Sequence, residues 1–218
     1  MTIDYSQVRE MMVEQQVRPW DVLDLRVLEA LSTVQREDFV PVEHRRLAYA
    51  DLEIPLGHGQ RMMKPVVEGR TLQGLALQPG DEVLEVGTGS GYLSACLGML
   101  ARDVLSLEIR PELAARADVQ LAASGHGSNV RVEVADALQY QTERRFDAIC
   151  VTAAVDVIPA QFLQWLRPQG RLFVIQGRSP VMEAVLVHND VNGPRLESLF
   201  ETDLPYLVGA APAPRFVF

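Results

Sequence analysis

The segment VLEVGTGSGYLSA, residues 83–95, constrains the fold more than any other, because it passes from a strand to a helix across three glycines. The apolar run of residues 81–86 is typical of a strand that is buried on both faces. Gly87, Gly89 and Gly91 alternate with small polar residues and predict a tight turn. The apolar pattern then resumes and predicts a helix over residues 92–100. A strand, a glycine turn and a helix in this order are typical of an open α/β sheet.

The chain beyond Gln78 continues to alternate between strand and helix patterns. Apolar or alternating runs predict further strands over residues 103–109, 129–136, 146–152, 170–177 and 182–190. Helices are predicted from Pro111 to about Ala123, where proline suits the first helical position, and around residues 159–166. Repeated β-α-β units predict a mainly parallel sheet with helices on both faces.

Residues 1–77 follow a different pattern and predict a helical cap beside the sheet. The segments SQVREMMVEQQV and LDLRVLEALSTV carry apolar residues at helical spacing. Prolines and glycines beyond Val40 predict a long irregular loop, and the final GAAPAPRFVF predicts an extended tail. We therefore expect a single folding unit, with a cap and loop over residues 1–77 and an α/β core over residues 78–218.

Composition excludes several classes of partner. The 218 residues include 29 acidic and 20 basic side chains, for a net charge of −9, and the basic residues are scattered. Nucleic-acid surfaces need clustered Lys and Arg, so no nucleic-acid partner is expected. No apolar leader or run of about 18 apolar residues is present, which predicts a cytoplasmic protein without a membrane partner. Cys96 and Cys150 lack metal-ligand spacing and are expected to be buried hydrophobes, with no metal site.

Three acidic residues at predicted strand ends indicate what the glycine turn binds. The glycines read G-x-G-x-G, not the G-x-G-x-x-G of a dinucleotide site, and no phosphate-loop motif is present. Glu85 would repel a pyrophosphate and attract an ammonium group. Glu108 can accept ribose hydroxyls, and Asp136 can accept from an adenine amino group. Each acid alone is also typical of a solvated strand end, but together they favour S-adenosylmethionine.

The predicted cofactor site places the carboxylate of S-adenosylmethionine at the start of the helix that begins near Tyr92. The product, S-adenosylhomocysteine, would occupy the same site. The residues expected to form it are Glu85, Gly87, Thr88, Gly89, Ser90, Gly91, Tyr92, Glu108, Ile109, Asp136, Ala137 and Thr152.

The fourth predicted core strand lacks an obvious catalytic base. It ends in VTAAV, residues 151–155, where Thr152 and two alanines offer no strong proton acceptor. A carboxylate acceptor would need none, because it is already ionised at pH 7 and only has to be positioned. The alternative is a base from elsewhere in the chain, such as His58 or Asp51.

At this point the chain resembles the protein-L-isoaspartate O-methyltransferases. The resemblance runs from the N-terminal helices to about Gly177 and rests on VQREDFVP, AYADLEIPLGHGQ, VLEVGTGSGY, SLEI, FDAICVTAAV and GRLFVIQG. It implies a Rossmann-like, seven-stranded methyltransferase sheet with an N-terminal helical cap. The implied activity is methyl transfer from S-adenosylmethionine to the α-carboxylate of isoaspartyl residues, which begins protein repair. The implied partner is a protein or peptide that contains such a residue, or another carboxylate acceptor.

Two departures from the family pattern concern the acceptor. The family loop usually reads G-Q-T-I-S-x-P, and its serine binds the isoaspartyl carboxylate, but Met63 occupies that position here. A thioether is a weak acceptor and donates no hydrogen bond. The family's C-terminal segment is also replaced. The acceptor loop expected from the resemblance comprises His58, Gln60, Arg61, Met62, Met63 and Lys64.

Arg61 and Lys64 flank Met63 and either contact an anionic acceptor or remain solvated loop cations.

Taken with the resemblance, the sequence predicts an S-adenosylmethionine-dependent O-methyltransferase of the isoaspartyl type. The alternatives are the same scaffold with a different acceptor, and a module that binds the cofactor without turnover. The pattern leaves the oligomeric state open.

Overall fold

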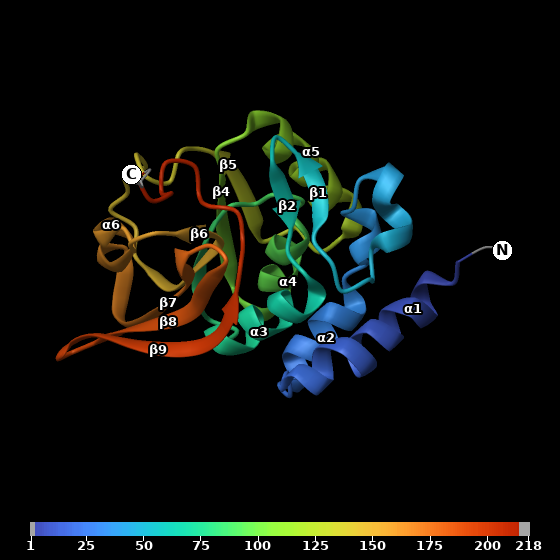
Figure 1. Cartoon of the computed structure of the whole chain (residues 1–218), viewed down its shortest axis with the longest axis horizontal. Coiled ribbons are helices and arrows are strands. Elements are labelled where there is room, and N and C mark those ends of the chain that lie inside the picture. The colour runs from blue at the N-terminus through green and yellow to red at the C-terminus, as the bar shows by residue number, and fades with distance from the viewer. Residues whose placement is uncertain (1–2, 214–218) are drawn as a thin grey trace, which may run out of the picture.

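The computed structural model describes residues 3–213, in which helices surround a large central sheet (Figure 1). The helices are α1 Tyr5–Met12, α2 Leu25–Thr33, α3 Pro65–Leu75, α4 Tyr92–Leu100, α5 Pro111–Ser124 and α6 Ala160–Gln164. The strands are β1 Ile54–Gly57, β2 Gln60–Met62, β3 Glu82–Val86, β4 Asp103–Glu108, β5 Val130–Val134, β6 Phe146–Val155, β7 Leu166–Arg178, β8 Val181–Asp190 and β9 Gly193–Thr202. Shorter helical turns follow α1 and α2.

The central sheet has seven strands in the order β5-β4-β3-β6-β7-β8-β9. The first five of these are parallel, whereas β8 and β9 run antiparallel to their neighbours. The strand order reverses between β3 and β6, because β3 continues to β4 on one side and pairs with β6 on the other. Ligands of open α/β sheets bind at such a switch point, beyond the carboxyl ends of the strands. The predicted Rossmann-like seven-stranded fold is confirmed.

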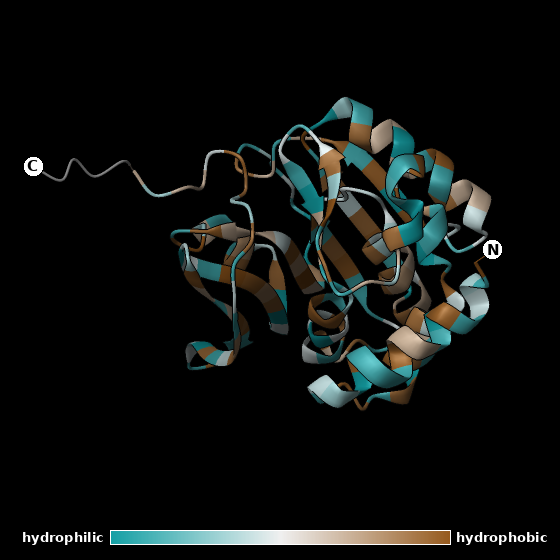
Figure 2. Ribbon diagram, turned by 45° about the vertical axis from the view of Figure 1, so that its right-hand side comes forward, coloured by the Kyte–Doolittle hydropathy of each residue, from teal (hydrophilic) through white to brown (hydrophobic). Residues whose placement is uncertain are grey.

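The central strands are buried on both faces, which explains their nearly continuous apolar sequence. Val83 and Leu84 are neighbours in β3, and both are fully buried. Since successive side chains of a strand point to opposite faces, they belong to two apolar clusters. One cluster contains cap and α4 residues such as Leu31, and the other contains α6 and its neighbour Trp165. Figure 2 shows the resulting band of apolar residues along the inner strands.

The prediction of a long irregular loop beyond Val40 is wrong, because this region contains a hairpin and a helix. β1 and β2 pair antiparallel, and α3 begins at Pro65. Pro65 can signal a loop, but it occupies the first helical position here, where its missing N–H costs nothing. Eight of the eleven residues of α3 are buried, and the helix packs against the cap and the sheet.

Strand β9 was not predicted. It lies at the edge of the sheet, pairs only with β8, and most of its residues are exposed. Its sequence, GPRLESLFET, therefore lacks the apolar run that marks the inner strands. Strands β6 and β7 extend beyond their predicted limits, and α6 is shorter than predicted because β7 already begins at Leu166.

The segment after β9 crosses the carboxyl end of β6 (Figure 1). The backbone of Ala154 accepts from the N–H of Leu207 at 2.8 Å and donates to the carbonyl of Pro205 at 2.9 Å. This places residues 204–208 over the switch point. Residues 209–213 form no helix or strand, and the rest of the predicted extended tail lies outside the described residues.

Both cysteines are free and fully buried, as predicted. Within residues 3–213, no helix combines the length and apolar character that a membrane span requires.

Candidate functional site

A pocket lies at the switch point, where β3, β4, β5 and β6 end. It encloses about 800 Å³, counting its open mouth. We call it the switch-point pocket. Its lining residues are Leu56, Gln60, Arg61, Met62, Met63, Glu68, Glu85, Val86, Gly87, Thr88, Gly89, Ser90, Leu93, Leu107, Glu108, Ile109, Leu113, Ala135, Asp136, Ala137, Thr152, Ala153, Leu207 and Val208.

The glycine turn brings backbone to the edge of this pocket. Gly87 has φ +98°, which is unfavourable for residues with a side chain. A Cβ at this position would lie 2.4 Å from Oγ1 of Thr152. That hydroxyl donates to the carbonyl of Gly87 at 2.6 Å and fixes the turn to the end of β6. Helix α4 begins directly after the turn, so the positive end of its dipole lies beside the pocket.

Glu85 is fully buried in the floor of the pocket. The hydroxyls of Ser94 and Ser106 both donate to its Oε2, the latter at 2.5 Å. Its Oε1 is buried and has no hydrogen-bond partner among residues 3–213. Burial raises the pKa of Glu85 to about 7. A buried carboxylate oxygen that lacks a donor fits a ligand with an ammonium group.

Glu108 and Asp136 line the same pocket beyond the next two strands. Oε2 of Glu108 accepts from the N–H of Gly89 at 2.8 Å, and Oε1 accepts from the N–H of Arg110 at 3.0 Å. Asp136 accepts from the N–H of Leu138 at 2.9 Å and from the side-chain amide of Gln139 at 2.8 Å. A carboxylate has about four acceptor positions, so both residues can also accept from ligand hydroxyl or amino groups. These bonds hold the carboxylates in place.

Ten of the twelve predicted cofactor residues line the pocket. The other two, Gly91 and Tyr92, do not. Gly91 is the left-handed residue that precedes α4. Tyr92 is buried, with its ring 5.8 Å from that of Phe39, and it packs against the cap. Both residues therefore belong to the junction between the glycine turn and α4 and make no part of the pocket wall.

The acceptor loop divides between two cavities. Gln60, Arg61, Met62 and Met63 line the switch-point pocket, and Met63 is 5% exposed. His58 is an exposed residue in the left-handed turn between β1 and β2 and is absent from the pocket lining. Lys64 lines a second cavity.

Neither alternative base lines the switch-point pocket. His58 is in the hairpin turn, and Asp51 lines the second cavity with Lys64. Thr152 and Ala153, near the end of β6, line the pocket, and neither is a strong proton acceptor. This arrangement suits an acceptor that is already ionised.

A buried ion pair supports the acceptor loop and was not predicted. Arg36, from the turn Arg36–Asp38, pairs with Glu68 of α3, and both side chains are almost fully buried. Arg36 also donates to the carbonyls of Met63 and Ala48, each at 2.7 Å, and lies 4.8 Å from the ring centroid of Tyr92. Burial raises the pKa of Glu68 to about 7, although Arg36 opposes the shift. The signal that the sequence offers for this ion pair is Glu68, an acid within the apolar run VVEG.

Comparisons with known proteins agree on one family. The model of the protein-L-isoaspartate(D-aspartate) O-methyltransferase family matches residues 7–194. Protein-L-isoaspartate O-methyltransferase 2 of Anaeromyxobacter sp. (strain Fw109-5) is 42% identical over 193 residues, which are 88% of this chain and 79% of that protein. Protein-L-isoaspartate O-methyltransferase 1 of Syntrophobacter fumaroxidans is 38% identical over 208 residues, 95% and 97% of the two chains.

Solved structures share the fold. A protein-L-isoaspartate O-methyltransferase of Plasmodium falciparum, crystallised with S-adenosyl-L-homocysteine, has a TM-score of 0.81 at 20% identity and covers 94% of this chain and 99% of its own. Another structure of that name has a TM-score of 0.76 at 22% identity, and the match covers 91% of this chain and 65% of the other. By sequence, and in agreement with its fold, the chain belongs to the protein-L-isoaspartate(D-aspartate) O-methyltransferase family.

Proposed function

We propose that the chain transfers the methyl group of S-adenosylmethionine to the α-carboxylate of isoaspartyl residues in proteins and peptides. The observation that carries the proposal is the row of acids along one pocket. In the part of the chain that the structure describes, Oε1 of Glu85 has no donor, while Glu108 and Asp136 accept from backbone N–H groups. The first suits the ammonium, the second the ribose and the third the adenine of the cofactor. Membership of the family supports the acceptor.

The residues present fit the cofactor. Glu85 would hold the amino group, the turn Gly87–Gly91 and the start of α4 the methionyl part, Glu108 the ribose and Asp136 the adenine. When bound, S-adenosylmethionine supplies an electrophilic methyl group on a sulfonium. The chain's contribution is to align the acceptor and exclude water. Leu207 and Val208, which the segment after β9 places at the pocket, help to cover it.

The acceptor needs no proton transfer. Its carboxylate is ionised near neutral pH, and its oxygen forms a bond to the methyl carbon as the carbon–sulfur bond breaks. Arg61 is the cation of the acceptor loop that lines the pocket, and its guanidinium lies 3.8 Å from the carboxylate of Glu53. It is therefore the residue placed to attract the acceptor.

Matched peptides test the proposal. Two peptides that differ only in an isoaspartyl or an aspartyl residue are incubated with radiolabelled S-adenosylmethionine, and base-labile methyl ester is measured. Methylation of the isoaspartyl peptide alone is expected. Methylation of other acids but not of this peptide would indicate the same scaffold with another acceptor. Cofactor binding without turnover of any acceptor would indicate a binding module.

The maximal rate should change little with pH above about pH 6, because the nucleophile is already ionised. His58→Ala should keep kcat within about tenfold, below the usual general-base contribution of about 10²–10⁴. Both are measured at saturating cofactor and peptide. A kcat that rises with a histidine-like pKa and falls sharply in His58→Ala would contradict the proposed carboxylate acceptor.

Cofactor affinity, by contrast, should increase with pH. In the free protein, burial raises the pKa of Glu85 to about 7, so the side chain is mostly protonated below that pH. An ammonium group favours the ionised form and lowers the pKa on binding. Affinity for S-adenosylhomocysteine should therefore rise by up to about tenfold per unit below pH 7 and level off near pH 8. Calorimetry at pH 6, 7 and 8 measures this, and a constant affinity would exclude the Glu85 contact.

Met63→Ser should raise kcat/KM for isoaspartyl peptides by up to about 10–100-fold. The serine hydroxyl would restore one hydrogen bond to a charged acceptor, a contact of about 1.5–3 kcal/mol. Lys64→Ala tests the other residue beside Met63, and because Lys64 lines the second cavity it should not abolish methylation. If wild type and Met63→Ser both leave the isoaspartyl peptide unmethylated, the isoaspartyl acceptor is wrong and the cofactor assignment stands.

A further inference from the structure

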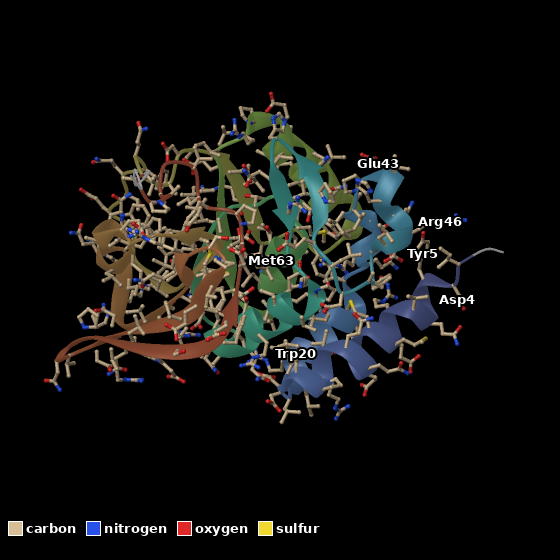
Figure 3. All side chains as sticks on the ribbon, viewed as in Figure 1. Asp4, Tyr5, Trp20, Glu43, Arg46 and Met63 are labelled. Atoms are coloured by element: carbon tan, nitrogen blue, oxygen red, sulfur yellow. The ribbon has the colours of Figure 1, made fainter. Side chains whose placement is uncertain are left out.

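The acceptor loop also borders a second cavity, next to the switch-point pocket along the chain. It is bounded by Trp20, the start of α3 and the end of β9, and encloses about 710 Å³, counting its mouth. None of the roles proposed so far uses it. Figure 3 shows Met63 near the centre of the molecule and Trp20 lower in the same view, close to α3.

The same two chain segments border both cavities. Met63 lines the switch-point pocket and Lys64, the next residue, lines the second cavity. Likewise, Leu204 lines the second cavity and Leu207 the switch-point pocket. The two cavities are therefore lined by residues that are adjacent or nearly adjacent in the chain. A polypeptide acceptor with one residue in the switch-point pocket can reach the second cavity with a neighbouring residue.

The second cavity carries an excess of negative charge. Among the described residues, four carboxylates line it, from Asp51, Glu53, Glu201 and Asp203, against two cations, Lys64 and Arg70. Glu53 also lies 3.8 Å from the guanidinium of Arg61, and an excess of carboxylates remains with that cation counted.

The guanidinium of Arg70 is already engaged by the protein. It donates to the carbonyls of Trp20 and Leu199, each at 3.1 Å, and lies 4.9 Å from the ring centroid of Phe200. The ring of Trp20 borders the cavity, and this residue is 52% exposed. An aromatic wall with excess carboxylates suits a side chain with an apolar stem and a cationic end.

We infer that the second cavity binds a lysine or arginine side chain of the acceptor polypeptide, one or two residues from the residue that is methylated. This inference rests on the proposed function, because it takes the acceptor to be a polypeptide. It makes the cavity a specificity site, separate from the residues that hold the cofactor.

Peptide kinetics test the inference. Isoaspartyl hexapeptides carry lysine, norleucine or glutamate at each position one or two residues from the isoaspartyl residue. At low salt and at the best position, kcat/KM for the lysine peptide should exceed that for norleucine by about 3–10-fold, and glutamate should be the poorest. The difference should shrink at high salt. Equal values for all peptides at low salt would overturn the inference.

A matched pair of double variants separates the cavity from the overall charge. Asp51→Asn/Glu201→Gln removes two exposed carboxylates of the cavity, and Glu183→Gln/Glu197→Gln removes two exposed carboxylates of β8 and β9 outside it. The first should abolish the preference for lysine and leave kcat/KM for the norleucine peptide unchanged. The second should preserve the preference. Equal loss in both would overturn the inference.

Trp20 provides a readout that does not depend on turnover. The other tryptophan, Trp165, is only 5% exposed. With S-adenosylhomocysteine present, the lysine peptide should change the fluorescence saturably in wild type and not in Trp20→Phe. If no peptide is methylated, the proposed function fails and this titration still decides on the cavity. A lysine peptide that leaves the Trp20 signal unchanged would overturn the inference even if methylation proceeds.

Discussion

Replacing Arg36 by methionine is expected to lower the free energy of unfolding by about 3–5 kcal/mol. Arg36 is fully buried, and its guanidinium neutralises Glu68 and donates to the carbonyls of Met63 and Ala48. Methionine can fill much of the space but satisfies none of these groups. The variant leaves an uncompensated carboxyl and two carbonyls without their donor.

The pH dependence of this loss has a definite sign. Burial already raises the pKa of Glu68 to about 7 with Arg36 present, and without Arg36 the pKa rises further. Glu68 must then remain protonated in the folded variant, while it ionises near its ordinary pKa in the unfolded chain. Below about pH 7 Glu68 is protonated in both folded proteins, so the cost of Arg36→Met should be nearly constant from about pH 5 to 7 and should grow as the pH rises above about 7.

Urea unfolding at several pH values measures the effect. Arg45→Met is the matched control, because Arg45 pairs with Asp38 at the surface, where an ion pair contributes less than about 1 kcal/mol. Arg36→Met/Glu68→Leu should recover most of the stability, since it removes both charges together. If Arg36→Met costs no more than Arg45→Met, the buried pair does not stabilise the loop.

The fold could be predicted where burial on both faces leaves a continuous apolar pattern. β3 and β4 fall within one residue of the predicted ranges, and α4 coincides with its prediction. The glycine turn and the acids predicted the cofactor, S-adenosylmethionine, and the family resemblance implied the O-methyltransferase class; both are confirmed by the family. Helix α3 was missed because Pro65 can signal either a loop or a helix start. Strand β9 was missed because an exposed edge strand needs no apolar run.

Some residues of the site could also be predicted from the sequence, and others could not. Glu85, Glu108 and Asp136 could be predicted because each follows from its position at a strand end, and all three line the pocket. The partners that orient Glu85 could not, because Ser94 and Ser106 come from a helix and a neighbouring strand and have no local signature. Lys64 illustrates the remaining limit, since spacing cannot tell which side of a loop a side chain occupies.

Glu108→Ala is expected to weaken the binding of S-adenosylhomocysteine by about 10–150-fold. The expected loss is that of a charge-assisted contact, about 1.5–3 kcal/mol. Glu108 is only 4% exposed and lines the pocket beside the glycine turn. Calorimetry measures the affinity, and Asp103→Ala, at the other end of β4, is the control that should leave it unchanged.

The alanine variant also removes the acceptor of the Gly89 and Arg110 N–H groups, so a disturbed glycine turn has to be separated from a lost ribose contact. A ligand that lacks a ribose hydroxyl makes the separation. If Glu108 binds the ribose, 2′-deoxy or 3′-deoxy S-adenosylhomocysteine should bind wild type more weakly than the parent compound does. In Glu108→Ala the deoxy and parent compounds should bind nearly equally, because the partner of the hydroxyl is gone. If the deoxy compounds lose the same affinity in both proteins, Glu108 supports only the turn. Wild-type affinity in the variant, or tighter binding of NAD than of S-adenosylmethionine, would overturn the ribose assignment itself.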